Sequence, residues 1–186
     1  MNSPAFETPA TTIPEILKES GPVVSISTSV GTIRIKLRSS YAPVTCESFA
    51  ELVEEGFYDG LLIHHVEPNS LIQTGDPNTQ EEDESLWGIG GPGFTLPLET
   101  GLTHAAGSVA MVSFSENEDE ADPQCNGSQF YITLREMPIY DHVRTVFGHV
   151  VEGLDVVEAI SRQPRHGTFR PERPIEITQA VVESES

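Results

Sequence analysis

A glutamine and a tyrosine stand two residues apart in the stretch Asn126–Ile132, which predicts a tight turn followed by a β-strand. Successive side chains of a strand point to opposite faces, so Gln129 and Tyr131 share one face. Phe130 and Ile132 share the other, which suits an apolar core. The first face presents an amide beside an aromatic ring, and these groups suit the binding of a peptide.

The balance of charge is strongly acidic, with 10 Lys and Arg against 29 Asp and Glu and a net charge of −19. A surface of this sign repels phosphate backbones and anionic lipids, so we expect neither nucleic acid nor a membrane as a partner. It indicates high solubility, with a preference for basic clients as the alternative. The 186 residues suffice for one domain with a sizeable core.

The expected location is the cytoplasm, and the expected state is a monomer. Residues 1–20 have neither the basic start nor the apolar stretch of a secretory signal, and no run of about 18 apolar residues predicts a membrane span. Cys46 and Cys125 make no disulfide framework. No neighbouring His or Cys would activate Cys125, so we expect it to be an inert surface thiol.

Two patterns could have indicated a cofactor or a metal. Gly88–Gly93 has the spacing of a dinucleotide-binding loop, but an acidic segment precedes it, and Pro92 and Pro97 discourage the helix that such a loop needs. His64 and His65 are adjacent, so on a strand they point to opposite faces and do not share a metal. We therefore expect no cofactor and no metal, with one core histidine and one that could line a site.

The periodicity of apolar residues predicts many short strands and two helices. A β-hairpin is expected from Val23–Ser29 and Thr32–Leu37, and a helix from Pro43 that ends at Gly56. A second helix should begin near Leu154, and a closing strand should span Pro174–Val182. The other predicted strands are Leu61–Val66, Leu71–Gln73, Ser108–Phe114, Gln129–Thr133 and Thr145–Val151. Many short strands with two helices favour a closed barrel, because closure removes exposed sheet edges.

Several short motifs follow one another along the chain in a consistent order. They are Thr32–Ile35, Ala42–Thr45 with Phe49, His64–Pro68, Gln73–Asp76, Gly91–Phe94, His104, Gly107–Met111, Asn126–Ile132 and Val146–Gly148 followed by Gly153. In this order they resemble the cyclophilin family of peptidyl-prolyl isomerases, over roughly residues 22–182. The resemblance implies an all-β fold, a closed eight-stranded antiparallel β-barrel capped by two α-helices, and a proline-binding groove on its outer surface. We expect an extension over residues 1–20, one domain over 21–182 and an acidic tail over 183–186.

The resemblance also assigns roles to single residues. Gln73 and Gln129 match the amides that bind the substrate backbone. Leu71 stands where the family usually has Met and Tyr131 where it usually has Phe, and both would pack the proline ring. The residues expected to edge the groove are Val112, Ser113 and Phe114.

Other positions depart further from the family pattern. His65 replaces the catalytic arginine, and Ser70 replaces a bulky aromatic of the proline pocket. Ile139 stands at the usual Trp position, with Tyr140 on the neighbouring pocket position. Arg144 replaces a histidine that borders the pocket.

Rotation about an X–Pro bond crosses a barrier of about 18–20 kcal/mol without breaking a covalent bond. A dry pocket favours the less polar twisted amide, and a cation aimed at the prolyl nitrogen stabilises only the transition state. Loss of such a donor at His65 typically costs about 10²–10³ in rate. We therefore expect a prolyl isomerase of reduced efficiency, with Arg144 either replacing the missing guanidinium or simply paired with a nearby acid. The alternative is a non-catalytic proline-binding, scaffold or chaperone domain.

Overall fold

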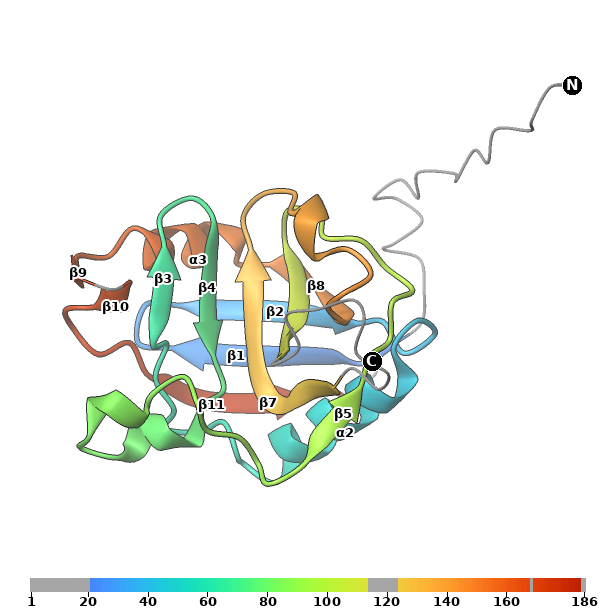
Figure 1. Cartoon of the computed structure of the whole chain (residues 1–186), viewed down its shortest axis with the longest axis horizontal. Coiled ribbons are helices and arrows are strands. Elements are labelled where there is room, and N and C mark those ends of the chain that lie inside the picture. Colours follow the sequence, from blue (N-terminus) through green and yellow to red (C-terminus); the bar gives the residue numbers. More distant parts are fainter. Residues whose placement is uncertain (1–20, 114–123, 168, 185–186) are drawn as a thin grey trace, which may run out of the picture.

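The computed structural model describes residues 21–113, 124–167 and 169–184. Its main body is a strongly curled antiparallel sheet in which β1, β2 and β11 cross behind β3, β4 and β7 (Figure 1). The strands are β1 (Val23–Thr28), β2 (Thr32–Leu37), β3 (His65–Glu67), β4 (Leu71–Thr74), β5 (Thr95–Pro97), β6 (Ser108–Ser113), β7 (Gln124–Thr133), β8 (Val146–Glu152), β9 (Arg165–His166), β10 (Arg170–Pro171) and β11 (Ile177–Val182). The helices are α2 (Pro43–Glu54) and α3 (Leu154–Ser161), with 3₁₀ turns η1 (Pro77–Gln80), η2 (Glu84–Leu86) and η3 (Pro138–Tyr140).

The sheet is open, so the predicted closed barrel is wrong in that respect. Its eight main strands follow the order β11-β1-β2-β8-β6-β7-β4-β3, and β5 pairs with β7 beside this path. The end strands β3 and β11 share no ladder. Between them, the Ile63 N–H donates to the Ile175 carbonyl at 2.9 Å and the Ile177 N–H to the Leu61 carbonyl at 2.8 Å. Of the predicted strand Leu61–Val66, only His65 and Val66 lie in β3, and Leu62 makes an isolated bridge to Glu176 that does not extend into a ladder.

The two predicted helices are confirmed. α2 begins at Pro43, which has no N–H to leave unpaired in the first turn, and Gly56 follows its end with a left-handed φ of +72°. Its inward face carries Phe49, and that ring contacts Tyr58, Phe130 and Phe147 at centroid distances of 5.0–5.3 Å. This aromatic group lies at the centre of the main core.

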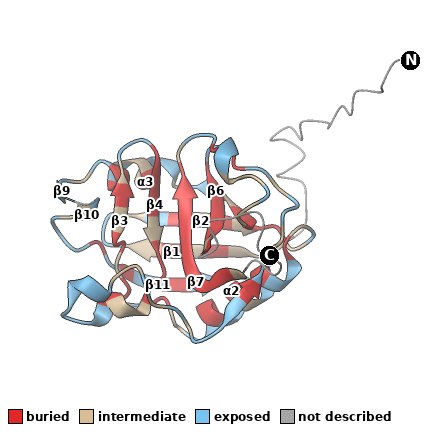
Figure 2. Cartoon of the chain, in the orientation of Figure 1, coloured by how far each residue is buried: buried red, intermediate tan, exposed pale blue. Residues whose placement is uncertain are grey.

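Strand β7 contributes both core residues and two of the predicted site residues, Gln129 and Tyr131. Phe130 and Ile132 point into the main core, yet the alternate residues Gln129 and Tyr131 are also buried, so the whole strand is covered on both faces (Figure 2). The outer face of β7 must therefore be covered by something other than the core. The structure shows that a loop and a second apolar cluster provide this cover.

Gly75 lets β4 approach β7 closely. Its φ is +88°, and a Cβ there would collide with the Ser128 carbonyl oxygen. Gly93 has a similar φ of +92° but no atom within 4 Å of the added Cβ. We expect Gly75→Ala to lower the free energy of unfolding by about 3 kcal/mol, because strain and collision add, and the control Gly93→Ala by only about 1 kcal/mol. Urea denaturation measures both losses, and equal losses would show that the close approach is unimportant.

Candidate functional site

One row of residues crosses the outer face of the sheet. His65 on β3 lies opposite Gln73 on β4, and Gln73 lies opposite Tyr131 on β7. Tyr131 in turn lies opposite Ala110 on β6, and Ala110 opposite Val146 on β8. Directly paired residues of neighbouring strands share a face. We call these five residues the outer row.

Two amides meet beside this row. Gln73 Nε2 donates to Gln129 Oε1 at 3.1 Å, and Gln129 Nε2 donates to the Gly90 carbonyl at 2.7 Å. The glycine-rich segment around Gly90 is a loop with no helix behind it, and the Gly88 and Gly90 N–H groups both donate to the Asp76 carboxylate. This loop therefore covers the outer face of β7 and holds the Gln129 amide in one orientation.

A buried histidine fixes the other amide. His64 Nε2 lies 3.3 Å from Gln73 Nε2, and because the amide nitrogen can only donate, the imidazole accepts. Burial lowers the pKa of His64 to about 4, against an opposing effect of Asp76, so the ring is neutral at pH 7. Both N–H groups of Gln73 are then engaged, and its Oε1 atom is the one left to accept a hydrogen bond from a peptide N–H.

An apolar cluster separate from the main core lies next to the amides. Its buried members are Leu71, Ala110, Tyr131, Met137 and Val146, and the half-buried residues Leu102, Val112 and Tyr140 pack against them. It includes four of the residues assigned to the groove from the sequence, namely Leu71, Val112, Tyr131 and Tyr140. The structure therefore places an apolar surface directly beside the paired amides.

The Tyr131 hydroxyl belongs to a buried chain of polar groups. It lies 2.8 Å from His104 Nε2, and His104 Nδ1 lies 2.9 Å from an Asp141 carboxylate oxygen that also accepts the His104 backbone N–H at 2.7 Å. Burial raises the pKa of Tyr131 and, outweighing Asp141, lowers that of His104. Tyr131 therefore donates to a neutral imidazole. Sequence reasoning did not assign His104 to the site, although a buried phenol needs a hydrogen-bond partner and that requirement was a usable signal.

His65 and Arg144 flank Tyr131 from opposite sides and do not meet. His65 Nε2 lies 3.1 Å from Glu67 Oε1, and its ring stacks on Phe169 at a centroid distance of 4.9 Å. Arg144 Nη1 donates to the Ser113 carbonyl at 3.2 Å. The Arg144 guanidinium lies 4.9 Å from the centre of the Tyr140 ring. The two residues proposed to supply a cation thus lie on the β3 side and the β6 side of Tyr131.

The remaining predicted residues are placed less centrally. Ser70 is buried just before β4, and the alternation along that strand puts it on the inner face with Ile72. Ile139 is 82% exposed on η3. Phe114 lies outside the described residues. Ser113 is buried and pairs with Cys125, which faces the main core, so Ser70 and Ser113 are described members of the predicted set that lie on the inner side.

Both cysteines are buried, so the expectation of a surface thiol at Cys125 is wrong. Burial raises the pKa of Cys46 to about 11 and also raises that of Cys125. The Cys46 thiol donates to the Phe147 carbonyl at 3.2 Å. β7 begins at Gln124, five residues before the predicted start at Gln129. Cys125 therefore lies within the strand and faces the main core.

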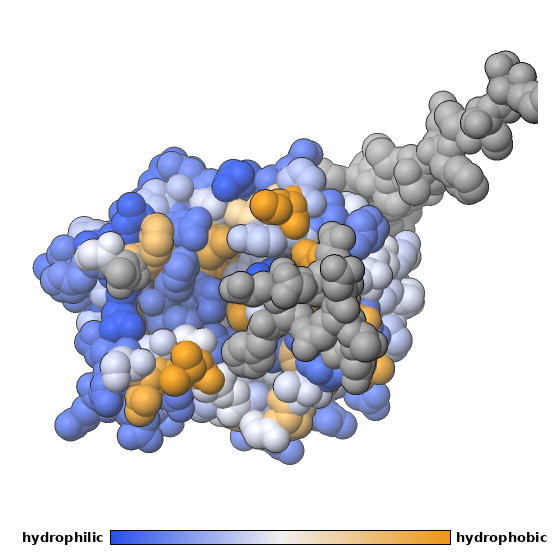
Figure 3. Space-filling model, viewed as in Figure 1, coloured by the Kyte–Doolittle hydropathy of each residue, from blue (hydrophilic) through white to orange (hydrophobic). Residues whose placement is uncertain are grey.

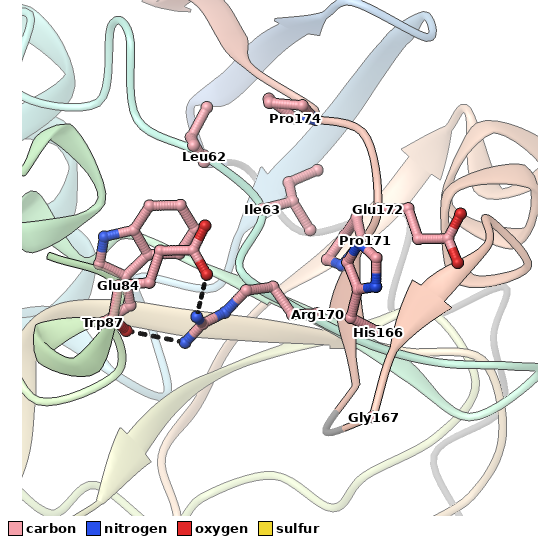
Figure 4. Close-up of a pocket in the computed structure, with 10 residues that line it drawn as sticks. All are labelled: Leu62, Ile63, Glu84, Trp87, His166, Gly167, Arg170, Pro171, Glu172 and Pro174. Atoms are coloured by element: carbon pink, nitrogen blue, oxygen red, sulfur yellow. Dashed lines mark hydrogen bonds and ion pairs between the residues drawn. The ribbon is translucent and has the colours of Figure 1, made fainter. Parts of the chain in front are cut away.

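A separate pocket of about 330 Å³ lies between η2 and the β9–β10 hairpin (Figure 4). Its lining is Leu62, Ile63, Glu84, Trp87, His166, Gly167, Arg170, Pro171, Glu172 and Pro174. Arg170 donates to Glu84 at 2.7 Å and lies 4.8 Å from the centre of the Trp87 ring. No residue of the predicted site lines this pocket.

The surface around these features is mostly hydrophilic, with apolar residues in separate patches (Figure 3). Among the described residues, no helix is long and apolar enough to span a bilayer. Within the same ranges, no three His, Cys, Asp or Glu side chains gather in a way that could hold a metal ion.

The buried histidine beside Gln73 makes stability depend on pH. His64 has a folded-state pKa of about 4, below its ordinary 6.5, so the unfolded chain binds the proton more readily. Stability from this group is complete above about pH 6.5 and falls as the pH decreases toward 4. Between pH 6.5 and 5 we expect the free energy of unfolding to fall by about 2 kcal/mol from His64.

Urea denaturation at both pH values measures this slope. His64→Gln, which keeps an acceptor for Gln73, should flatten it, whereas replacing the exposed His166 with Gln should not. A slope unchanged by His64→Gln would contradict the assignment.

Comparisons with known proteins show which family the chain resembles. A family model described as cyclophilin type peptidyl-prolyl cis-trans isomerase/CLD matches residues 23–182. The peptidyl-prolyl cis-trans isomerase ppi1 of Schizosaccharomyces pombe is 38% identical over 161 residues, which cover 86% of this chain and 97% of that protein. The peptidyl-prolyl cis-trans isomerase-like 1 of Aspergillus oryzae is 33% identical over 163 residues, covering 87% and 96%.

Solved structures show the same likeness. The crystal structure of a Cryptosporidium parvum cyclophilin type peptidyl-prolyl cis-trans isomerase has a TM-score of 0.78 at 26% identity, covering 90% of this chain and all of that one. A second crystal structure of that protein, in the presence of the dipeptide Ala-Pro, has a TM-score of 0.77 at 27% identity and covers 88% and 99%. With a family model matched over nearly the whole described fold, this chain belongs to the cyclophilin-type peptidyl-prolyl cis-trans isomerases.

Proposed function

We propose that this chain isomerises X–Pro bonds in proline-containing peptides or proteins, and that it does so at the outer row. The observation that carries the proposal is the Gln73–Gln129 amide pair, 3.1 Å apart, directly beside the apolar cluster around Tyr131. The cluster would take the pyrrolidine ring, and Gln73 Oε1 would accept a hydrogen bond from the peptide backbone. Both groups are held by buried partners, so little ordering is required on binding.

The chemistry requires no bond-making partner. Twisting the X–Pro bond removes the resonance of the amide and makes it less polar, so an apolar surface that excludes water stabilises the twisted form. Hydrogen bonds that hold the peptide backbone on one side of the X–Pro bond allow the other side to rotate relative to it. The Leu71–Tyr131 surface and the two amides would perform these two tasks.

We propose a reduced rate because of His65. Its imidazole is shorter than the guanidinium it replaces, and its Nε2 atom lies 3.1 Å from Glu67 while its ring stacks on Phe169. These contacts direct the ring toward the edge of β3. A poorly placed donor at this position would leave the prolyl nitrogen without much of the charge stabilisation that speeds rotation.

Arg144 is the residue that we propose as a partial replacement. Its guanidinium lies over Tyr140, whose ring is 6.1 Å from that of Tyr131. The apolar cluster therefore has a cation at its β6 side. Because Arg144 already donates to the Ser113 carbonyl, one of its other N–H groups would have to serve the substrate.

Binding without catalysis is the second candidate, and the replacement of the catalytic arginine by His65 favours it. A binding domain needs the cluster and the amides but not the cation. Two measurements on one X–Pro peptide separate the candidates. Exchange between cis and trans peptide signals in NMR reports turnover, and peptide titration reports affinity. In either case we retain the sequence-based expectation of a cytoplasmic monomer.

Restoring the cation should raise activity. We expect His65→Arg to increase kcat/KM for a short Ala-Pro peptide by about 10²-fold, because one well-placed charged donor is worth that much. Gln179→Arg adds the same charge on β11 and serves as the matched control. NMR exchange measures both variants. No increase in His65→Arg, with peptide affinity retained, would show that His65 does not limit the rate.

Removing the second cation should have the opposite effect. We expect Arg144→Ala to reduce kcat/KM at least tenfold with a small change in peptide affinity, because the proposed interaction strengthens in the transition state. Arg144→Lys should recover part of the rate, since it retains the charge. If Arg144→Ala leaves isomerisation unchanged, Arg144 acts only in packing on Tyr140.

A further inference from the structure

Basic residues are concentrated next to His65. The segment Arg162–Arg173 holds four of the ten Lys and Arg residues and a single acidic one, whereas the rest of the chain holds 28 of the 29 Asp and Glu. The segment contains the β9–β10 hairpin, which lies beside β3 (Figure 1). A positively charged edge on so acidic a protein is a local feature, because screening limits charge effects to about 8 Å at physiological salt.

The hairpin is fixed against β3. The Val66 N–H donates to the Phe169 carbonyl at 2.7 Å. Phe169 holds a left-handed φ of +62°, which bulky residues rarely adopt, and its side chain is still partly exposed. Backbone strain of this kind persists only where the surroundings over-determine it. The position of the Phe169 ring on His65 is therefore set by the fold.

The ring of Phe169 connects His65 to a cation. It stacks on the His65 ring at 4.9 Å, and the Arg165 guanidinium lies 5.4 Å from its centre. Two other arginines of the segment are neutralised, Arg162 by Glu158 at 2.6 Å and Arg170 by Glu84 at 2.7 Å. Among the described residues, Arg165 pairs with no carboxylate. It is a cation held on an aromatic ring at the end of the outer row.

We propose that Arg165 and Phe169 form a specificity subsite for an acidic residue of the client, so that the protein prefers X–Pro segments carrying Asp or Glu near the proline. This inference rests on the proposed function of the outer row. Neighbouring strands are about 4.8 Å apart, so His65 is roughly 10 Å from Tyr131. Arg165 lies beyond His65, up to roughly 10 Å further across the Phe169 ring. An extended peptide covers roughly 3.3 Å per residue, and with the added reach of a Glu side chain this places the acid about four residues from the proline.

The preference runs against the overall charge of the protein. A net charge of −19 disfavours acidic clients at long range, and the alternative expected from composition alone is a preference for basic ones. The subsite acts instead at contact distance, and the carboxylate of Glu67 at this end of the outer row is itself held 3.1 Å from His65 Nε2. The subsite therefore favours acidic peptides, whereas the net charge of the protein favours basic ones. One set of peptides distinguishes the two.

The test uses two pairs of Ala-Pro peptides on the full chain. One pair carries Glu or Gln four residues before the proline, and the other carries Glu or Gln four residues after it. Dissociation constants from NMR titration and kcat/KM from exchange are measured at low salt and at 0.5 M NaCl. For one pair we expect the Glu peptide to be favoured about threefold to fivefold, the range of an exposed ion pair, and the preference to disappear at high salt.

Arg165→Gln should remove this preference, and Arg165→Glu should invert it. Lys36→Gln, which removes the same charge from β2, should leave it intact. A ratio below 1.5 in both pairs, or a preference that survives in Arg165→Gln, would overturn the subsite. If no peptide is isomerised, the proposed activity fails, and the dissociation constants alone decide whether the acidic preference stands.

Discussion

The pairing of β4 with β7 is the constraint on which the site depends. Ile72 lies opposite Ile132 in the main core, and this pair places Gln73 opposite Tyr131 on the outer face. A slip of one residue would exchange the two faces and bury the amides in the core. The close approach at Gly75 secures the register, because only a residue without Cβ fits against Ser128.

Much of this could be predicted from particular residues. The alternation at Gln129–Ile132 indicated the correct faces of β7, and Pro43 and Gly56 marked where the first helix begins and ends. These signals are local, and local backbone preferences decide them. The placement of Leu71, Gln73, Tyr131 and Tyr140 came from their order in a family pattern, and the structure brings them together.

The errors concern contacts between segments far apart in the sequence. The open edge of the sheet depends on how Ile63 and Val66 contact Ile175 and Phe169, more than a hundred residues away, and no periodicity in the sequence indicates these contacts. Cys125 was predicted to be exposed, but β5 pairs with the start of β7 and Cys125 is buried. That pairing joins segments distant in the sequence. Ser70 was assigned to the pocket by alignment, whereas strand alternation directs it inward. His104 belonged to the family pattern but was not assigned to the site, because its contribution there is the hydrogen bond with the Tyr131 hydroxyl.

The cations lie beside the apolar cluster and not within it. The cluster and amides occupy the middle of the outer face, with Arg144 on one side and the His65–Phe169–Arg165 stack on the other. With His65 in place, the apolar cluster and the amides are fully formed, and positive charge lies at both sides of them. If the outer row is the site, as we propose, binding of proline and the rate of isomerisation can vary independently.

The most direct measurement follows a short Ala-Pro peptide titrated into ¹⁵N-labelled protein. We expect the side-chain NH₂ signals of Gln73 and Gln129 to shift together with one saturable dissociation constant, while the indole N–H signal of Trp87 in the separate pocket does not shift. Shifts at Trp87 without shifts at the two glutamines would contradict the central claim that proline segments bind at the outer row.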